Sequence, residues 1–249
     1  RSPSRGLGDV YKRQFVNNQH GFVKGRSTTT NLLLYEQALL GAFEKRCQVD
    51  SIYTDFSKAF DRVCHGLLLA KLKALDVAGN VIKWLECYLT GRTQKVILQN
   101  MFLSFSIEVT SGVPQGGHLS PLLFNLFIND ICDTIKNCQC LLYADDLKLF
   151  CPVANTSDCL CIQSDLCELQ KWCLLNLMEL NANKCNVIAF HKNKNPIIYN
   201  YILNNVPLNR LNVVKDLGVY FDTQLTFNHH INICTNKACL LYTSDAADD

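Results

Sequence analysis

LLYADDLKLF, residues 141–150, holds two adjacent carboxylates, Asp145 and Asp146, inside an otherwise apolar run. Charged side chains are rarely buried unless they are paired or bind a metal ion. The apolar residues on either side predict a hairpin over residues 140–151 with its turn at 144–146. Neighbouring side chains at such a turn can both point outward. The stretch therefore predicts half of a divalent-metal site at the tip of a hairpin.

A second source of carboxylate is expected elsewhere, because a hard cation such as Mg²⁺ takes oxygen ligands and keeps waters and substrate phosphates. The stretch VDSIYTDF, residues 49–56, is typical of a strand and ends near Asp55. Asp55 beside the hairpin turn would suit phosphoryl transfer between two metal ions about 4 Å apart. Taken alone, the ADD turn is equally compatible with an exposed acidic turn.

The composition is that of a globular protein, with 48% hydrophobic and 18% charged residues among 249. The net charge of +2 gives only weak support for a polyanionic partner. The 14 cysteines include no recurring C-x2-C pair, which argues against structural zinc and favours buried, reduced thiols of an intracellular protein. No apolar run reaches the roughly 20 residues that span a membrane.

The two ends are interpreted as one DNA tag translated in opposite orientations. DVYKRQ, residues 9–14, can be encoded by GATGTGTATAAGAGACAG, whose reverse complement, from its second base, encodes CLLYTS, residues 239–244. The tag resembles the adapter of transposase-based sequencing libraries. We therefore set residues 1–14 and 239–249 apart from the native chain and expect a fragment of a longer protein.

Helical and strand patterns alternate between these ends. Ser27 can cap a helix to about residue 47, and further helices are expected over 58–75, 79–90, 120–132 and 157–180. For the helix over 120–132, Ser120 followed by Pro121 is the cap and first-turn signal. Strand patterns cover residues 49–56, 93–100, 104–112, 140–151 and 184–190. One more hairpin is expected from residues 196–205 and 213–221. Helices mixed with mostly antiparallel strands predict an α+β fold.

The motif-bearing blocks are QHGFVKGRSTTTNLL, DFSKAFDRVCHGLLLAKL, SGVPQGGHLSPLLFNLFIND, LLYADDLKLF, LNANKCNVIAF and VKDLGVYFD. In this order they resemble reverse transcriptases of non-LTR (LINE-type) retrotransposons, nearest to jockey-like elements. The resemblance implies a right-hand polymerase palm, an antiparallel sheet with packed helices, plus part of the fingers and no thumb. It assigns residues 15–48 to partial fingers and 49–230 to a palm with embedded fingers elements and a primer-grip-like hairpin. Residues 231–238 would be a truncated native end.

The resemblance also implies the catalytic residues. Asp55, Asp145 and Asp146 match the family's metal-binding carboxylates, with Mg²⁺ as two ions and Mn²⁺ as a substitute. Lys184 matches a lysine that acts as general acid toward the pyrophosphate leaving group. An ordinary lysine at a strand edge is the alternative for Lys184.

A further group matches the positions around the incoming deoxynucleoside triphosphate: Arg26, Lys24, Lys58, Ala59, Phe60, Gln115 and Gly116. A planar guanidinium suits phosphate, which favours Arg26 over Lys24, although a solvated basic loop is the alternative. Phe60 matches the bulky residue that excludes a ribose 2′-hydroxyl, or else it is a core aromatic.

The last matched block concerns the primer. Lys215, Leu217 and Gly218 match the hairpin that steadies the primer terminus, mostly through backbone and shape.

The implied function is RNA-directed DNA polymerase, for target-primed synthesis at nicked DNA in an intracellular setting of nucleus and cytoplasm. Its partners would be an RNA template, the element's own RNA, a DNA primer and deoxynucleoside triphosphates, without a membrane. Three alternatives stay open: an inactive or RNA-binding remnant of a decayed element, a group II intron maturase or telomerase with the same chemistry, and a palm-fold nucleotidyl cyclase. A cyclase should lack both GVPQG and Phe60.

Overall fold

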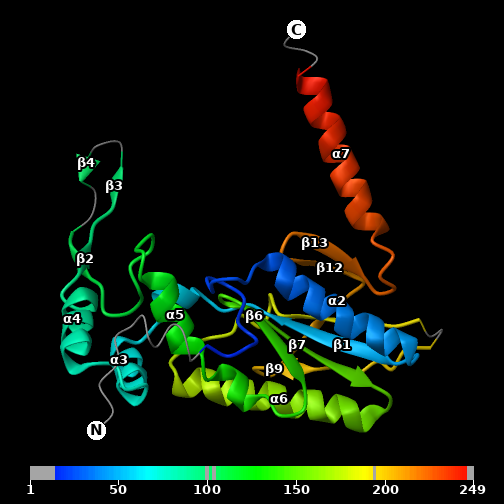
Figure 1. The fold of residues 1–249 in the computed structure, drawn as a ribbon, viewed down its shortest axis with the longest axis horizontal. Helices are drawn as coiled ribbons and strands as arrows, with labels where there is room; N and C mark the ends of the chain where they lie inside the picture. Colours follow the sequence, from blue (N-terminus) through cyan, green and yellow to red (C-terminus); the bar gives the residue numbers. More distant parts are fainter. Residues whose placement is uncertain (1–14, 99–100, 103–104, 193–194, 246–249) are drawn as a thin grey trace.

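A computed structural model of the chain describes residues 15–98, 101–102, 105–192 and 195–245. Figure 1 shows a central sheet with helix α2 along one face and helix α6 along the other. An arm of helices and short strands extends from one end of the sheet, and helix α7 leaves the body near the other. The mixed α+β architecture confirms the predicted fold class.

The sheet has five strands in the order β11-β8-β1-β7-β6. Its strands are β1 (Gln48–Thr54), β6 (Gln139–Tyr143), β7 (Asp146–Val153), β8 (Asn186–Phe190) and β11 (Asn209–Leu211). The central strand β1 pairs antiparallel with both β7 and β8, β6 pairs antiparallel with β7, and β11 runs parallel to β8. The predicted hairpin around the two aspartates is therefore confirmed.

Both faces of the sheet are covered, which explains why β1 shows no alternation of polar and apolar residues. Val49 packs into the apolar cluster that includes Tyr35 and Leu39 of α2. Ile52 points to the opposite cluster, which includes Leu166 and Leu169 of α6. The strand is thus buried on both sides up to Thr54.

The helices are α2 (Thr28–Glu44), α3 (His65–Ala74), α4 (Gly79–Leu89), α5 (Ser120–Ile128), α6 (Thr156–Leu175) and α7 (Asn228–Asp245). Two short 3-10 turns, η1 (Ala59–Asp61) and η2 (Ile131–Thr134), complete them. Ser27 caps α2 as predicted: its side chain accepts from the Thr30 backbone N–H, and the Thr30 hydroxyl oxygen accepts from the Ser27 N–H.

Short hairpins surround this framework. They pair β2 (Thr93–Gln94) with β5 (Ile107–Glu108), β3 (Ile97–Leu98) with β4 (Met101–Phe102), β9 (Ile202–Leu203) with β10 (Val206–Pro207), and β12 (Val213–Asp216) with β13 (Val219–Asp222). The single hairpin predicted over 196–221 was wrong. Asn204 and Asn205, both with positive φ, close β9 and β10 directly, and β12 and β13 form a separate hairpin.

Two helix predictions need correction. The helix predicted over 58–75 is interrupted, because the carbonyls of Phe60 and Val63 accept hydrogen bonds from Val113 and Gly112 of a distant loop instead of continuing a helix. Ser120 does not cap α5, because the cap is Leu119 and the Ser120 hydroxyl donates to the Pro114 carbonyl. In the first place a contact from a distant loop outweighs the local signal, and in the second a contact within the preceding loop does so.

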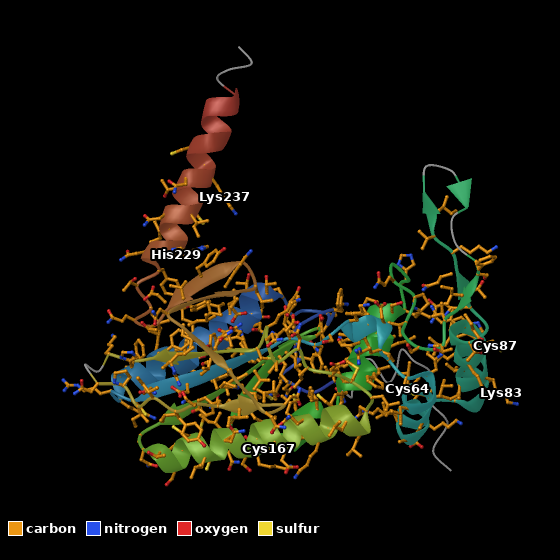
Figure 2. The ribbon with its side chains drawn as sticks, turned by 180° about the vertical axis from the view of Figure 1, so that it is seen from behind. Cys64, Lys83, Cys87, Cys167, His229 and Lys237 are labelled. Carbon is orange, nitrogen blue, oxygen red and sulfur yellow. The ribbon has the colours of Figure 1, made fainter. Side chains whose placement is uncertain are left out.

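The cysteines only partly follow the expectation of buried thiols. All 14 are free, and Cys140, Cys159, Cys173 and Cys185 are buried. Others are exposed, such as Cys87 on α4 and Cys167 on α6 (Figure 2). No helix among the described residues is long and apolar enough to cross a membrane.

The tag interpretation of the two ends stays a prediction. Residues 1–14 lie outside the described residues, and residues 239–245 continue helix α7.

Candidate active site

Strand register brings the predicted carboxylates together. Thr54, the last residue of β1, pairs with Leu147 of β7 in antiparallel register. Asp55 follows Thr54 and Asp146 precedes Leu147, so these two aspartates occupy the same end of neighbouring strands. Asp145 lies next to them on the turn between β6 and β7.

A cavity of about 190 Å³ opens at this end of the sheet. Its lining includes five of the predicted site residues: Asp55, Asp146, Lys184, Lys215 and Leu217. Two of the three predicted metal ligands, the predicted general acid and the predicted primer hairpin therefore meet around one space, although they come from distant parts of the chain. Asp145 is not among the lining residues.

The carboxylates disfavour one another's ionised form. The pKa of Asp146 is raised to about 6, and the largest cause is the loss of hydration of its carboxylate. Its side chain nevertheless reaches the surface. The negative charges of Asp145, Asp216 and Asp55 add to this effect. The pKa of Asp145 is raised by burial and then by the charge of Asp55. A cluster of this kind is stabilised by a cation.

The donor set fits a hard divalent ion. Among the described residues, no three His, Cys, Asp or Glu side chains are grouped so that they could hold a metal ion by themselves. Mg²⁺ needs fewer protein ligands, because one or two carboxylates together with waters and substrate phosphates complete its octahedral shell. Asp55, Asp145 and Asp146 supply oxygens of the required kind. A bound cation would also offset the electrostatic repulsion between these carboxylates.

Lys184 lies beside Asp55, with 3.7 Å between its Nζ and the Asp55 Oδ2. Both side chains are well exposed, at 67% and 41%, so the pair adds little to stability. The backbone between them is more firmly held, because Asn181 N–H donates to the Asp55 carbonyl and Lys184 N–H donates to the Asn181 carbonyl. The loop before β8 thus brings Lys184 to the carboxylates.

Phe60, Ala59 and Lys58 follow the first aspartate around η1. The Phe60 ring stacks on Phe124 of α5 with 4.3 Å between centroids, and it is only half-buried. Ala59 is buried, whereas Lys58 is exposed and adopts a left-handed conformation. The Phe60 ring is therefore packed on one side and partly accessible to solvent. This arrangement is compatible with the predicted role of excluding a ribose 2′-hydroxyl.

Gln115 and Gly116 belong to the loop before α5. The Gln115 side-chain amide donates to Asp61 Oδ1 at 2.9 Å, so Asp61 pairs with this loop. Gln115 and Lys58 line a second, more open cavity of about 760 Å³. Gly116 has a φ of +77°, which a side chain would disfavour. These residues are gathered near η1 but do not line the carboxylate cavity.

Arg26 has structural partners. Its guanidinium donates to the backbone carbonyls of Val16, Asn17 and Gln19 and to the Asn17 side chain. It thereby ties the turn before α2 to the preceding segment. Lys24 is exposed on the same turn. Neither lines the carboxylate cavity, and their phosphate-binding role stays a prediction.

The predicted primer hairpin is the β12–β13 pair. Leu217 and Gly218 form its two-residue turn with φ values of 45° and 96°. Lys215 and Leu217 face the carboxylate cavity, and Gly218 supplies the turn. The hairpin thus stands directly beside Asp146.

Three residues that the sequence analysis did not single out support this arrangement. Lys148 and Asp216 form a buried ion pair that joins β7 to β12, and the Tyr53 hydroxyl donates to the same Asp216 carboxylate at 3.2 Å. Lys148 lies inside the apolar run DLKLF, and a lysine in such a run could have indicated a buried ion pair with an acidic residue. A fourth such residue, Gln19, contacts Ala144 at the start of the turn and gave no signal beyond its place in the QHGF block.

Comparison with known proteins agrees with this geometry. Residues 5–232 match the family described as "Reverse transcriptase (RNA-dependent DNA polymerase)". The chain is 30% identical over 240 residues to the "Probable RNA-directed DNA polymerase from transposon BS" of Drosophila melanogaster, covering 91% of this chain and 26% of that protein. It is 30% identical to the "RNA-directed DNA polymerase from mobile element jockey" of Drosophila funebris, covering 86% and 24%. The chain therefore spans about a quarter of the length of these relatives.

Solved structures show the same fold. Apo telomerase from Candida tropicalis superposes with a TM-score of 0.61 at 11% identity, covering 89% of this chain and 38% of that one. Telomerase from Candida albicans gives 0.58 at 13% identity, covering 88% and 36%. At such identity the likeness concerns the fold alone, which agrees with a polymerase palm and fingers. Because the family match extends over residues 5–232, which is most of the chain, the chain belongs to the reverse transcriptase family.

Proposed function

We propose that this chain is the palm, residues 49–230, and part of the fingers, residues 15–48, of an RNA-directed DNA polymerase. The observation that carries the proposal is the register of β1 and β7, which sets Asp55 beside the Asp145–Asp146 turn. Family membership supports it. In this proposal a primer 3′-hydroxyl attacks the α-phosphate of a deoxynucleoside triphosphate, and pyrophosphate leaves.

Each group around the cavity then has a defined task. Asp55, Asp145 and Asp146 would hold two Mg²⁺ ions, or Mn²⁺, and these ions would stabilise the charge on the attacking and leaving oxygens. The Lys184 ammonium is a proton source for the departing pyrophosphate. The β12–β13 hairpin, through Lys215 and the turn at Leu217 and Gly218, steadies the primer end.

The remaining predicted residues select and orient the nucleotide. Phe60 excludes a ribose 2′-hydroxyl, and Gln115 and Gly116 lie beside the base pair being formed. Arg26 and Lys24 contact the triphosphate, and for Arg26 this requires that its contacts to residues 16–19 rearrange on binding.

The proposed partners are an RNA template, the element's own RNA, and a DNA primer at a nicked target. The jockey polymerase of D. funebris, which is named for a mobile element, supports this choice over a group II intron maturase. One solved telomerase is described in complex with a fragment of telomeric RNA. Work on nicked chromosomal DNA would take place in the nucleus, after synthesis in the cytoplasm.

The test is deoxynucleotide incorporation on a primed RNA template with Mg²⁺. Because the chain covers 24% of the D. funebris jockey polymerase, residues 15–232 would replace the matching segment of that protein, which supplies the rest. Asp145→Asn removes a carboxylate charge with little change of shape. Asp133→Asn, at an exposed aspartate in η2, is the matched control.

We expect incorporation by the chimera and by Asp133→Asn, and a loss of at least about a hundredfold in Asp145→Asn, the scale of removing one electrostatic group from an active site. A folded chimera that binds RNA but incorporates nothing would instead favour a decayed remnant. Undiminished incorporation by Asp145→Asn would refute the assignment of the site.

A further inference from the structure

The turn that carries the two aspartates holds a residue in an unfavourable conformation. Ala144, directly before Asp145, has a φ of +55°, in the left-handed region. For a residue with a Cβ this region costs about 1 kcal/mol or more, and it persists only where the surroundings enforce it. Ala144 is buried, at 6% exposure, so its peptide groups also need partners within the protein. Something must therefore hold this turn.

The side chain of Gln19 provides both partners. Its Oε1 accepts from the Ala144 N–H at 2.9 Å, and its Nε2 donates to the Ala144 carbonyl at 3.2 Å. The same Oε1 also accepts from the Gly21 N–H at 2.7 Å. Gln19 is 1% exposed. One carboxamide thus satisfies the N–H and the C=O of the left-handed residue at once.

The segment around Gln19 is fixed to β6 by its backbone. Leu142 N–H donates to the Asn18 carbonyl, and His20 N–H donates to the Leu142 carbonyl, both at 2.9 Å. A Cβ added to Gly21 would lie 2.2 Å from the Ala144 nitrogen, so only glycine permits this approach. The segment therefore lies against the turn and forms an isolated parallel bridge, Gln19 to Leu142, with β6.

We propose that Gln19 is a positioning residue: its carboxamide holds Ala144 in the left-handed conformation and thereby directs Asp145 and Asp146 toward Asp55. The effect of Gln19 on catalysis rests on the proposed function. Its effect on the conformation of the turn does not. The task requires a donor and an acceptor on one neutral group. Glutamate keeps the acceptor and loses the donor, and alanine loses both.

The first test measures amide hydrogen exchange by mass spectrometry in the purified chain, using the peptide that spans residues 141–147. Gln19→Ala and Gln19→Glu are compared with Asn18→Ala as the matched control. Asn18 lies on the same segment, but its side chain donates to Cys140 and not to the turn. Peptides from β1 and α6 report whether each variant keeps the overall fold.

We expect exchange in 141–147 to rise about tenfold in both Gln19 variants, as the loss of one to two hydrogen bonds predicts, with β1 and α6 unchanged. Asn18→Ala should leave the turn close to wild type. Unchanged exchange in the Gln19 variants would overturn the inference, and so would an equal rise in Asn18→Ala.

The second test uses rescue in the jockey chimera. Glycine adopts the left-handed conformation without a Cβ penalty, so Ala144→Gly should restore part of the activity lost in Gln19→Ala. We expect Gln19→Ala to lower kcat about tenfold or more with KM for the nucleotide within about twofold, since the defect lies in the alignment of carboxylates and not in nucleotide binding. A double variant no better than Gln19→Ala would overturn the catalytic part.

The two proposals fail separately. An inactive wild-type chimera with faster exchange in the Gln19 variants would refute the polymerase proposal and keep Gln19 as the residue that holds the turn. An active wild type whose Gln19 variants match it in exchange and kcat would refute the inference alone.

Discussion

Phe60 can act as a selective surface because its ring is held in place. Rejecting one hydroxyl group by contact requires a side chain that does not move aside, and the stacking on buried Phe124 restricts the Phe60 ring. The part of the ring that stays accessible is the part that could meet a sugar. Packing and selection are therefore compatible roles of one aromatic residue.

Phe60→Val should relax sugar discrimination. We expect the ratio of kcat/KM for deoxynucleotides to that for ribonucleotides to fall by about 10- to 100-fold, the scale of losing a steric contact of this size. Steady-state kinetics with both nucleotide types in the jockey chimera measures the ratio. Phe60→Tyr keeps the aromatic ring and should therefore leave the ratio of kcat/KM values unchanged. An unchanged ratio in Phe60→Val would leave Phe60 as a core aromatic.

Asp165 illustrates how one buried carboxylate can fix a loop. It accepts hydrogen bonds from the backbone N–H groups of Lys136, Asn137 and Cys138 and from the Asn137 side chain. Burial alone would raise the pKa of Asp165, but the backbone donors outweigh burial and the pKa is lowered. The fold therefore favours the ionised form of this residue.

This pKa gives a pH dependence of defined sign. A folded pKa below the unfolded value of about 3.9 adds stability that is complete above that value and disappears as pH falls through the folded pKa. Asp165→Asn should cost about 2 kcal/mol in the free energy of unfolding at pH 7 and less at pH 3. Urea titrations at both pH values test this, with the exposed Asp133→Asn as control. An equal cost at the two pH values would contradict the assignment.

The β12–β13 hairpin is joined to β7 by charge as well as by apolar contact. Lys148 and Asp216 are 5% and 7% exposed, and the Lys148 ammonium also lies 4.4 Å from the centre of the Tyr35 ring. Burial is the main cause that lowers the pKa of Lys148, and the Asp216 charge opposes it. Each charge is thus tolerated in the interior only because the other is present.

Breaking this pair from one side should therefore cost more than removing it altogether. We expect Lys148→Met to lower the free energy of unfolding by about 3–5 kcal/mol, because Asp216 is left buried and unpaired. The double variant Lys148→Met/Asp216→Leu should recover much of that loss. Urea unfolding of both single variants and the double variant gives the coupling energy. Additive effects would show that the two side chains do not depend on each other.

Local sequence was informative for elements whose signals lie within a few residues. The strand that ends before Asp55, the hairpin that holds the two aspartates and the Ser27 cap were predicted because periodicity and cap chemistry are local. The interruption after η1 was not, since its cause is a hydrogen bond from Gly112 to the Val63 carbonyl. The Lys148–Asp216 pair and the Gln19 contacts join residues 68 and 125 positions apart. No pattern within a window of sequence contains such partners.

The body of the protein ends where α7 begins to leave it. Tyr220 of β13 contacts His229 and His230 of the first helical turn, with ring centroids 5.1 and 6.3 Å apart. Farther along, residues 234–239 are exposed, and Figure 2 shows Lys237 standing clear of the sheet. Most of α7 thus makes little contribution to the packed core.

Deleting residues 234–249 should accordingly leave the rest intact. We expect the free energy of unfolding to change by no more than about 0.5 kcal/mol, while the helical signal in circular dichroism decreases. Urea unfolding followed by tryptophan fluorescence measures the first quantity, since Trp84 and Trp172 both lie outside α7. A loss of several kcal/mol would mean that α7 packs on the body in solution.

The docking of Gln19 against Ala144 also bears on how the chain is made. Residue 19 is synthesised before its partner, which follows 125 residues later in the chain. At about 5–20 residues per second, the QHGF segment waits roughly 6–25 s before its binding surface has been synthesised. Until then the turn that carries Asp145 and Asp146 does not exist, and the segment around Gln19 has no partner to pack against. Slower translation of residues 19–144 would lengthen the time for which the segment around Gln19 stays exposed. Chaperone binding and aggregation would then have more time to compete with its docking.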